Sequence, residues 1–289
     1  MQIYDRQLKI YEEEIEYEKE KLEFLYNTVL GRILLKTFVA RPIFSKFRAR
    51  YYKSAKSVKD IVPFIEKHGV DVSEWNVEEF NSFNGFFTRK KAINIDSKPE
   101  ELLSIADARL SVYRIDDDTK LNIKNSIYSV GAIVKDEEIA KDFSGGFALV
   151  FRLAADDYHR HSFVDDGEIV KTYRIKGMLH TVRPLAEKYK VYSANSREVT
   201  VYDTHNFGRV VQIDVGALLI GAMVNTYTDK STKKMSEKGY FEYGGSTIVL
   251  LVGPNCSIDE DIMNQSAQGF ECKVRIGDKI GIVNKPKEN

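Results

Sequence analysis

Residues 242–251, EYGGSTIVLL, place two glycines and two hydroxyl residues directly before an apolar run rich in β-branched residues. The run predicts a buried strand, and the glycine pair before it predicts a turn. A turn that enters a strand explains the stretch without special chemistry. A second interpretation is that the peptide bond between Gly245 and Ser246 is built to be broken, because glycine leaves its carbonyl unhindered and serine supplies a nucleophilic hydroxyl.

Short β-rich runs of this kind fill the chain from about residue 103 onward, and glycines separate them. A helical stretch precedes them near residues 58–68, and a helical turn is expected near 181–188. Many short strands with turn signals between them are typical of sheets that pack face to face. Residues 61–289 are therefore predicted to form one β-rich domain of packed, mostly antiparallel sheets. The clearest runs are 145–154, 209–224, 246–253 and 271–283.

The first sixty residues have a different composition. Residues 12–23 hold seven glutamates among helix formers and predict a solvated helix, whereas residues 24–59 hold nine bases and no acid. Aromatic and aliphatic residues alternate with these bases, and Pro42 divides the stretch into two basic, amphipathic pieces. Residues 1–60 are thus predicted to be an N-terminal helical region, which makes the whole chain an α+β protein.

Two interpretations of the basic stretch remain open. It forms ordinary surface helices, or it lies on a membrane with its apolar anchors in the interface and its bases facing anionic headgroups. A nucleic-acid partner is not expected, because the net charge is zero and no stacking motif of the common RNA-binding modules is present.

The location of the protein is predicted from what the chain lacks. Cys256 and Cys272 are too few for a disulfide framework or a zinc site, which favours a reducing compartment. Acids stand at the N-terminus where a signal peptide needs bases and then an apolar stretch. The longest apolar run, residues 215–224, is half the length that crosses a bilayer. A peripheral protein is therefore expected, and no segment that spans the membrane.

A serine, a histidine and an aspartate are the minimum set that activates a hydroxyl. Here they would be Asp107, His159 or His161, and Ser246, in that order along the chain. The two histidines stand two residues apart, but no carboxylate or cysteine cluster with ligand spacing accompanies them, so no metal site is expected. The sequence does not show whether these side chains meet.

Five blocks in order carry a resemblance to a known family. They are FNGFFTRK at 83–90, SIADARL at 104–110, DYHRHSF at 157–163, VGALLIGAM at 215–223 and EKGYFEYGGST at 237–247. They resemble blocks of the phosphatidylserine decarboxylases, a family of pyruvoyl-dependent enzymes that cleave themselves. GGST alone is a weak signal, but five blocks spread over residues 75 to 283 are specific.

The resemblance implies a role for the opening stretch. Ser246 Oγ would attack the carbonyl of Gly245, and elimination at Ser246 would release chain 1–245 and leave a pyruvoyl group at the start of chain 246–289. This cofactor accepts electrons while CO2 leaves the substrate, as pyridoxal phosphate would. The implied reaction converts phosphatidylserine into phosphatidylethanolamine at the cytoplasmic face of the cell membrane. The partners implied are an anionic membrane surface and the protein's own cleaved chain, as a heterodimer or a dimer of heterodimers.

The resemblance also assigns roles to the other candidates. The sequence departs from the family pattern at Ile105, Ala108 and Arg109, which replace the proline, glycine and lysine of S-P-x-D-G-K, and at Ser162. His159 would protonate the α-carbon of the substrate, and Asp107 is the aspartate of the S-P-x-D-G-K block. The second histidine of D-Y-H-R-x-H, which links the aspartate to the serine, falls on Ser162, and His161 stands one position early. Three alternatives follow: His161 takes over, His159 serves both steps, or cleavage is slow or lost. The last would leave a catalytically silent membrane- or lipid-binding protein of the same fold.

Overall fold

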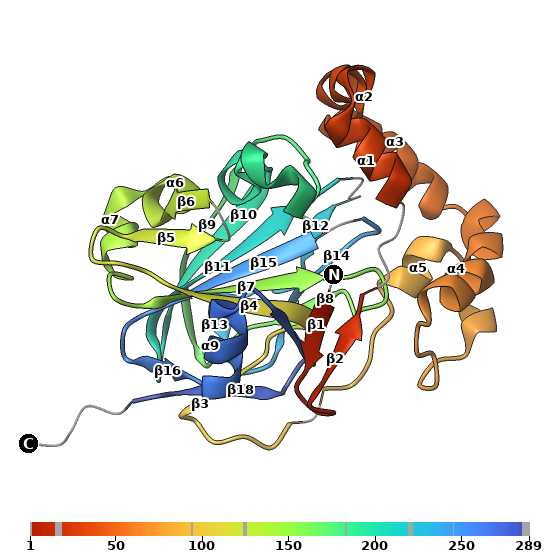
Figure 1. The fold of residues 1–289 in the computed structure, drawn as a ribbon. Helices are drawn as coiled ribbons and strands as arrows, with labels where there is room; N and C mark the ends of the chain where they lie inside the picture. The colour runs from red at the N-terminus through yellow and green to blue at the C-terminus, as the bar shows by residue number, and fades with distance from the viewer. Residues whose placement is uncertain are drawn as a thin grey trace, which may run out of the picture.

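A mixed sheet of ten strands forms the centre of the molecule, with the order β13-β9-β10-β11-β15-β7-β4-β17-β1-β2 (Figure 1). The computed structural model describes residues 2–14, 19–93, 95–123, 126–182, 184–218, 222–244 and 246–284. The pairing of β1 with β17 is parallel, and the other described pairs in this sheet are antiparallel. The strands are β1 (Gln2–Asp5), β2 (Ile10–Glu13), β4 (Ala108–Arg114), β7 (Phe147–Leu153), β9 (Gly167–Ile175), β10 (Arg197–Thr204), β11 (Gly208–Gly216), β13 (Ser231–Thr232), β15 (Ser246–Val252) and β17 (Glu271–Val274).

Three smaller sheets and several short helices accompany the central sheet. The sheets are β12 (Met223–Asn225) with β14 (Glu237–Phe241) and β8 (Arg160–Ser162); β16 (Cys256–Ile258) with β18 (Lys279–Val283) and β3 (Glu101–Leu103); and β5 (Lys120–Ile123) with β6 (Ser126–Ser129). The helices are α6 (Val130–Val134), α7 (Glu137–Lys141), the 3₁₀ turn Pro184–Tyr189, α8 (Val191–Ala194) and α9 (Glu260–Ala267).

Strands β7 and β15 are buried at every position, because both faces of the sheet are covered. Side chains alternate between the faces, so Val249 and Leu251 join one core cluster while Ile248 and Leu250 join the other. Residues of α6, α7 and α8 belong to the first cluster. Phe241, at the end of β14, belongs to the second, which places the β12-β14-β8 sheet over the Ile248 face.

The prediction of an α+β protein with mostly antiparallel sheets is confirmed. The runs at 145–154 and 246–253 form β7 and β15, and the run at 271–283 forms β17 and β18. The run at 209–224 forms β11 and then begins β12. The helical turn expected near 181–188 is the 3₁₀ turn Pro184–Tyr189.

The solvated helix predicted over residues 12–23 is wrong at its start. Residues 10–13 form β2, helix α1 begins at Lys19, and residues 15–18 lie outside the described part of the chain. Strand β1 pairs with β17, more than 260 residues later, and β2 pairs with β1. Pairing at the edge of the sheet overrides the local helix preference of the glutamates.

The remaining N-terminal elements are helical and lie beside the central sheet (Figure 1). Helix α3 begins at Pro42, which explains the division of the basic stretch, because proline suits the first turn of a helix. No helix in the described ranges is long and apolar enough to cross a membrane. The elements are α1 (Lys19–Asn27), α2 (Val29–Leu34), the π-helix Leu35–Val39, α3 (Pro42–Tyr52), the 3₁₀ helix Ala55–Asp60, α4 (Ile61–His68), the 3₁₀ turn Val77–Glu79 and α5 (Phe83–Phe87).

Candidate active site

Ser246 is the first residue of β15 and lies between Gly216 of β11 and Leu153 of β7. Its side chain is fully buried, and Oγ has no hydrogen-bond partner among the described residues. A buried hydroxyl without a partner costs about 1–3 kcal/mol of folding free energy. Gly244, two residues earlier, has a φ of 142°, a conformation that favours glycine. Gly245 itself lies outside the described residues.

A cavity of about 320 Å³ adjoins this end of β15. Two neighbours of Ser246 line it: Leu153, its partner on strand β7, and Gly244, two residues earlier in the chain. Aromatic side chains from Phe87 and Tyr243 form part of its wall, and charged side chains including Arg152 form another part. A concave site that combines apolar walls with a few polar groups is typical of a ligand pocket.

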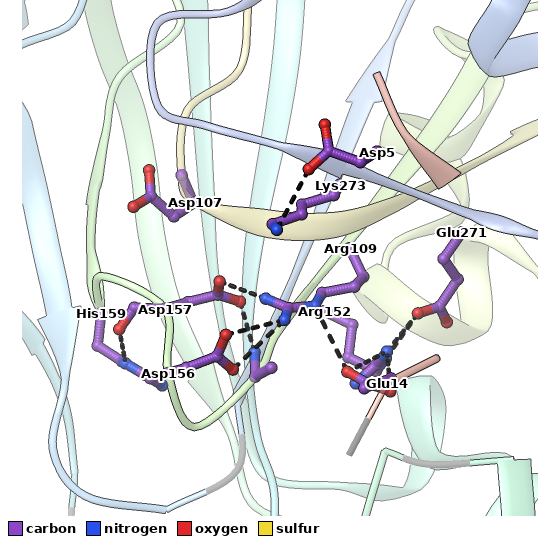
Figure 2. Close-up of polar contacts among 12 residues, drawn as sticks. Asp5, Glu14, Asp107, Arg109, Arg152, Asp156, Asp157, His159, Glu271 and Lys273 are labelled. Carbon is purple, nitrogen blue, oxygen red and sulfur yellow. Dashed lines mark hydrogen bonds and ion pairs between the residues drawn. The ribbon is translucent and has the colours of Figure 1, made fainter. Parts of the chain in front are cut away.

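His159 lies in the loop after β7 and is buried, with its ring 3.9 Å from the ring of Phe87 between centroids. Its Nδ1 lies 2.9 Å from the backbone oxygen of Asp157 (Figure 2). A carbonyl oxygen only accepts hydrogen bonds, so Nδ1 carries the proton and the lone pair is on Nε2. Nε2 has no hydrogen-bond partner in the described part of the chain. Burial lowers the pKa of His159 to about 3, which keeps the ring neutral at neutral pH.

This lowered pKa predicts a loss of stability in mild acid. Below pH 6.5 the unfolded chain binds a proton at His159 that the folded chain does not bind until about pH 3. The free energy of unfolding should therefore fall by about 2 kcal/mol between pH 7.5 and pH 5, at roughly 1.4 kcal/mol per pH unit below 6.5. Urea titrations at both pH values measure this loss of unfolding free energy. They are made on the uncleaved chain and on its His159→Gln variant.

The comparison with the glutamine variant isolates His159 from its neighbour Asp157. Burial raises the pKa of the Asp157 carboxyl to about 6 against the pull of Arg109, so Asp157 stabilises the folded state as the pH falls through 6. That contribution is common to both proteins and cancels in their difference. The same pH dependence in both proteins would contradict the account of His159.

His161 lies in the middle of β8 and contacts a different carboxylate from the predicted one. Its Nε2 is 3.4 Å from Asp214 Oδ2, and Lys238 Nζ is 2.5 Å from the same oxygen. All three side chains are at most 2 % exposed. Burial alone would raise the pKa of Asp214, but the Lys238 ammonium and His161 hold it well below its ordinary value. Neither ring nitrogen of His161 makes a hydrogen bond among the described residues, so its 3.4 Å approach to Asp214 is a close contact rather than a hydrogen bond.

The strand register of the central sheet shows where Asp214 lies relative to Ser246. Asp214 lies opposite Ile248, and Gly216 lies opposite Ser246, so Asp214 and Ser246 occupy diagonal positions on the same face. Side chains at diagonal positions are roughly 7–8 Å apart, within reach of a third side chain that lies over both. His161 reaches this face from β8, which pairs with β14 above it. Asp214 is therefore one diagonal step along the sheet from Ser246, and His161 contacts Asp214 from the β12-β14-β8 sheet.

Asp107 has other partners. Its Oδ1 accepts a hydrogen bond from the backbone N–H of Ile276 at 2.7 Å, and its Oδ2 lies 3.7 Å from Lys91 Nζ. Within the described ranges, it makes no hydrogen bond or ion pair with either candidate histidine. The role expected for Asp107 remains a prediction.

Asp214 was not among the residues predicted from the sequence. The signal was present, because an acid stands alone in the apolar run RVVQIDVGALLIGAMV at 209–224. A carboxylate inside a predicted buried strand needs a charged partner, and that requirement alone marks it as a candidate.

Two buried arginines on the cavity wall were missed as well. Arg109 binds Asp156 and Asp157, and Arg152 binds Glu14 and Glu271 (Figure 2). Each arginine is at most 7 % exposed in its side chain. Glu14 follows β2, so the N-terminal arm that the sequence analysis took for a helix supplies part of this network.

Comparison with known proteins places these residues in a family context. A model of the phosphatidylserine decarboxylase family matches residues 80–282, which include all five blocks. The chain is 48% identical to phosphatidylserine decarboxylase proenzyme 2 of Clostridium acetobutylicum, over 98% of each chain. It is 40% identical to the phosphatidylserine decarboxylase proenzyme of Ruminiclostridium cellulolyticum, over 97% of each, and 37% identical to that of Clostridium botulinum, over 97% of this chain and 98% of the relative.

Proposed function

The chain belongs to the phosphatidylserine decarboxylase family, and we propose that it converts phosphatidylserine into phosphatidylethanolamine and CO2 after cutting itself between Gly245 and Ser246. Family membership confirms the predicted enzyme class, a carboxy-lyase made as a proenzyme. The observation that carries the proposal is the buried, unpartnered hydroxyl of Ser246 beside the cavity. The silent alternative gains no support from the relatives, whose names all describe proenzymes.

Self-cleavage needs only atoms of this chain and water. Ser246 Oγ adds to the carbonyl carbon of Gly245, the C–N bond of the peptide breaks, and an ester links the two chains. Loss of the α-proton of Ser246 and of the Cβ–Oγ bond then releases Gly245 as a carboxylate. Water replaces the nitrogen of the remaining dehydroalanine, ammonia leaves, and chain 246–289 keeps a pyruvoyl group.

We assign the removal of the serine proton to His161, with Asp214 as its orienting carboxylate. Asp214 is held ionised by Lys238, so it can stabilise a proton on His161. Ser246 lies on the same sheet face one diagonal step away. This assignment adopts the first of the three alternatives for the base and gives the orienting role to Asp214 in place of Asp107, which lies near Lys91.

The surroundings of Ser246 fit a pyruvoyl group, because its buried Oγ is bound by no described hydrogen-bond partner and the neighbours Leu153 and Gly244 line the cavity. Once formed, the group supplies a ketone that withdraws electrons as CO2 leaves. His159 would deliver a proton to the α-carbon, and because its ring is neutral in the uncleaved chain it must first take that proton up. Nε2 is the ring atom that can take and give it, because Nδ1 is engaged with the Asp157 carbonyl.

The fold would hold the two chains together after the cut. Strand β15 lies between β11 and β7, and β17 lies between β4 and β1, so chain 246–289 is inserted twice among strands of chain 1–245. A heterodimer of the two chains is therefore expected to survive cleavage without a covalent link.

Membrane attachment is proposed for the outer end of the helical region. Four apolar residues of α2 are between 41 and 68 % exposed, although side chains of this type are normally buried. Arg32 and Lys36 are exposed beside them. Figure 1 shows α2 at the outer end of the helices, away from the central sheet. This arrangement fits a peripheral protein that inserts apolar anchors among anionic headgroups, and we place it at the cytoplasmic face. The four residues are Val29, Leu30, Ile33 and Leu34.

Replacing Leu30 and Ile33 together with serine should weaken binding to anionic vesicles by at least about 100-fold, because each buried side chain of this size contributes about 1.5–3 kcal/mol. Vesicle co-sedimentation measures the loss. The matched control is Leu8→Ser, since Leu8 is 63 % exposed but lies in the N-terminal strand hairpin. Equal binding by the double variant and the control would contradict the assignment of α2.

The proposed activity is tested by adding fully cleaved protein to vesicles that contain phosphatidylserine and measuring phosphatidylethanolamine by mass spectrometry. Appearance of phosphatidylethanolamine with one CO2 per molecule is expected. Cleaved protein that forms neither product would contradict the substrate assignment.

A further inference from the structure

The segment directly before the predicted scissile bond is attached to the helical region by an ion pair. Glu242 has a side chain only 6 % exposed, and its Oε1 lies 2.6 Å from Lys53 Nζ. Lys53 is the residue that ends α3, almost 190 positions earlier in the chain. The second oxygen of Glu242 is buried without a hydrogen-bond partner in the described part of the chain. The lysine is thus the charged group that compensates this carboxylate.

The next residue, Tyr243, is attached to the same helices by its ring and its backbone. Its ring lies 4.5 Å from that of Tyr52 in α3 and 4.9 Å from that of Phe83 in α5, between centroids. Its backbone N–H donates to Asn84 Oδ1 at 3.3 Å. Two successive residues, immediately before the two glycines, are therefore fixed to α3 and α5.

We propose that Lys53 and Asn84 are positioning residues for self-cleavage, and that α3 and α5 form part of the maturation machinery. The proposal rests on the proposed cut between Gly245 and Ser246. Attack by Ser246 Oγ requires the Gly245 carbonyl to be held about 3–3.5 Å away in the correct orientation. The glycines cannot provide this by themselves, because glycine has the most backbone freedom of any residue. Fixing Glu242 and Tyr243 restrains that freedom from the upstream side.

An ion pair here is better explained by positioning than by stability. Glu242 is buried, but the side chain of Lys53 is 52 % exposed, so solvent screens the pair on the lysine side and its net gain in stability is small. What the pair provides is a single orientation, since Glu242 has to point at the end of α3 to be compensated. Helix α3 follows α2 in the chain through the π-helix Leu35–Val39, so the segment before the proposed cut is attached to the same helical region that is proposed to meet the membrane.

The test measures cleavage of freshly translated protein over time in a cell-free system. Lys53→Met should slow cleavage at least 10-fold, and Lys53→Arg should restore most of the rate. Lys53→Glu should slow it further, and the exchanged pair Lys53→Glu with Glu242→Lys should return it to within a few fold of the unmodified chain. Lys56→Met is the matched control, because Lys56 is exposed in the 3₁₀ helix that follows α3. It should cleave at the normal rate.

A purely structural role is separated by melting temperatures, measured for each variant in the uncleaved Ser246→Ala background. Slow cleavage by Lys53→Met with an unchanged melting temperature supports positioning. Normal cleavage by that variant, or slowing that matches a loss of folded precursor, would overturn the proposal. An exchanged pair that regains the melting temperature but not the cleavage rate would also overturn it. Failure of the unmodified chain to cleave would instead refute the proposed function on which the inference rests.

Discussion

Ser246→Ala should leave one uncut chain and no decarboxylase activity. The alanine has no hydroxyl to attack the Gly245 carbonyl, so no ester and no ketone form. Loss of both is expected to be complete, since the hydroxyl oxygen is the nucleophile of the only cut proposed. Gel electrophoresis and intact mass report cleavage, and the vesicle assay reports phosphatidylethanolamine. Ser246→Cys keeps a nucleophile that can carry out the same acyl shift.

Thr247→Val is the matched control for this variant. Thr247 is the next residue of β15, is fully buried, and also has a hydroxyl without a partner among the described residues. Its side chain points to the opposite face of the sheet, because neighbours in a strand alternate. Valine has nearly the same shape, so Thr247→Val should cleave normally. Processing of the Ser246→Ala chain at the same bond would contradict the assignment of the nucleophile.

The two histidines should separate into two phenotypes. His161→Ala should slow cleavage by 10² or more, because the base next to Ser246 is lost. Asp214→Asn should slow it as well, since the amide cannot stabilise a proton on His161. His159→Ala should cleave but then decarboxylate about 10²–10⁴-fold more slowly per cut chain. The fraction of chain cut over time, beside product per cut chain, measures both effects.

Rescue distinguishes the base from the packing around it. Asp214→Glu keeps the negative charge and should cleave faster than Asp214→Asn, whereas a purely structural role would penalise the larger side chain more. The double variant His161→Ala with Ser162→Ala tests whether His159 serves both steps. If it does, this variant will still cleave rapidly and completely. That outcome would remove His161 from the mechanism.

Much of the central sheet could be predicted because its signals are local. The run after Ser246 is apolar or β-branched over the rest of β15, and β7 is apolar except for Arg152. Pro42 marks the start of α3 for an equally local reason. In each case the residues that decide the element lie within it.

The N-terminal strands could not be predicted in this way, because residues far away in the sequence stabilise them. Residues 10–13 favour a helix by composition, and only the pairing of β1 with β17 makes them part of a sheet edge. The pairing of His161 with Asp214 depends similarly on the packing of β8 over β11, more than 50 residues away. Motif order offered the candidate histidines and the serine, whereas the contact of His161 with Asp214 is a property of register and layer packing that local sequence does not encode.

The central claim is that this chain makes its own cofactor, and intact mass of the purified protein tests it most directly. The account predicts two chains, one of residues 1–245 and one of residues 246–289. The second should be lighter than a chain headed by serine by one ammonia, and its N-terminus should be blocked to sequencing but open to a carbonyl reagent. A single mass for residues 1–289, or a second chain that begins with free serine, would contradict it.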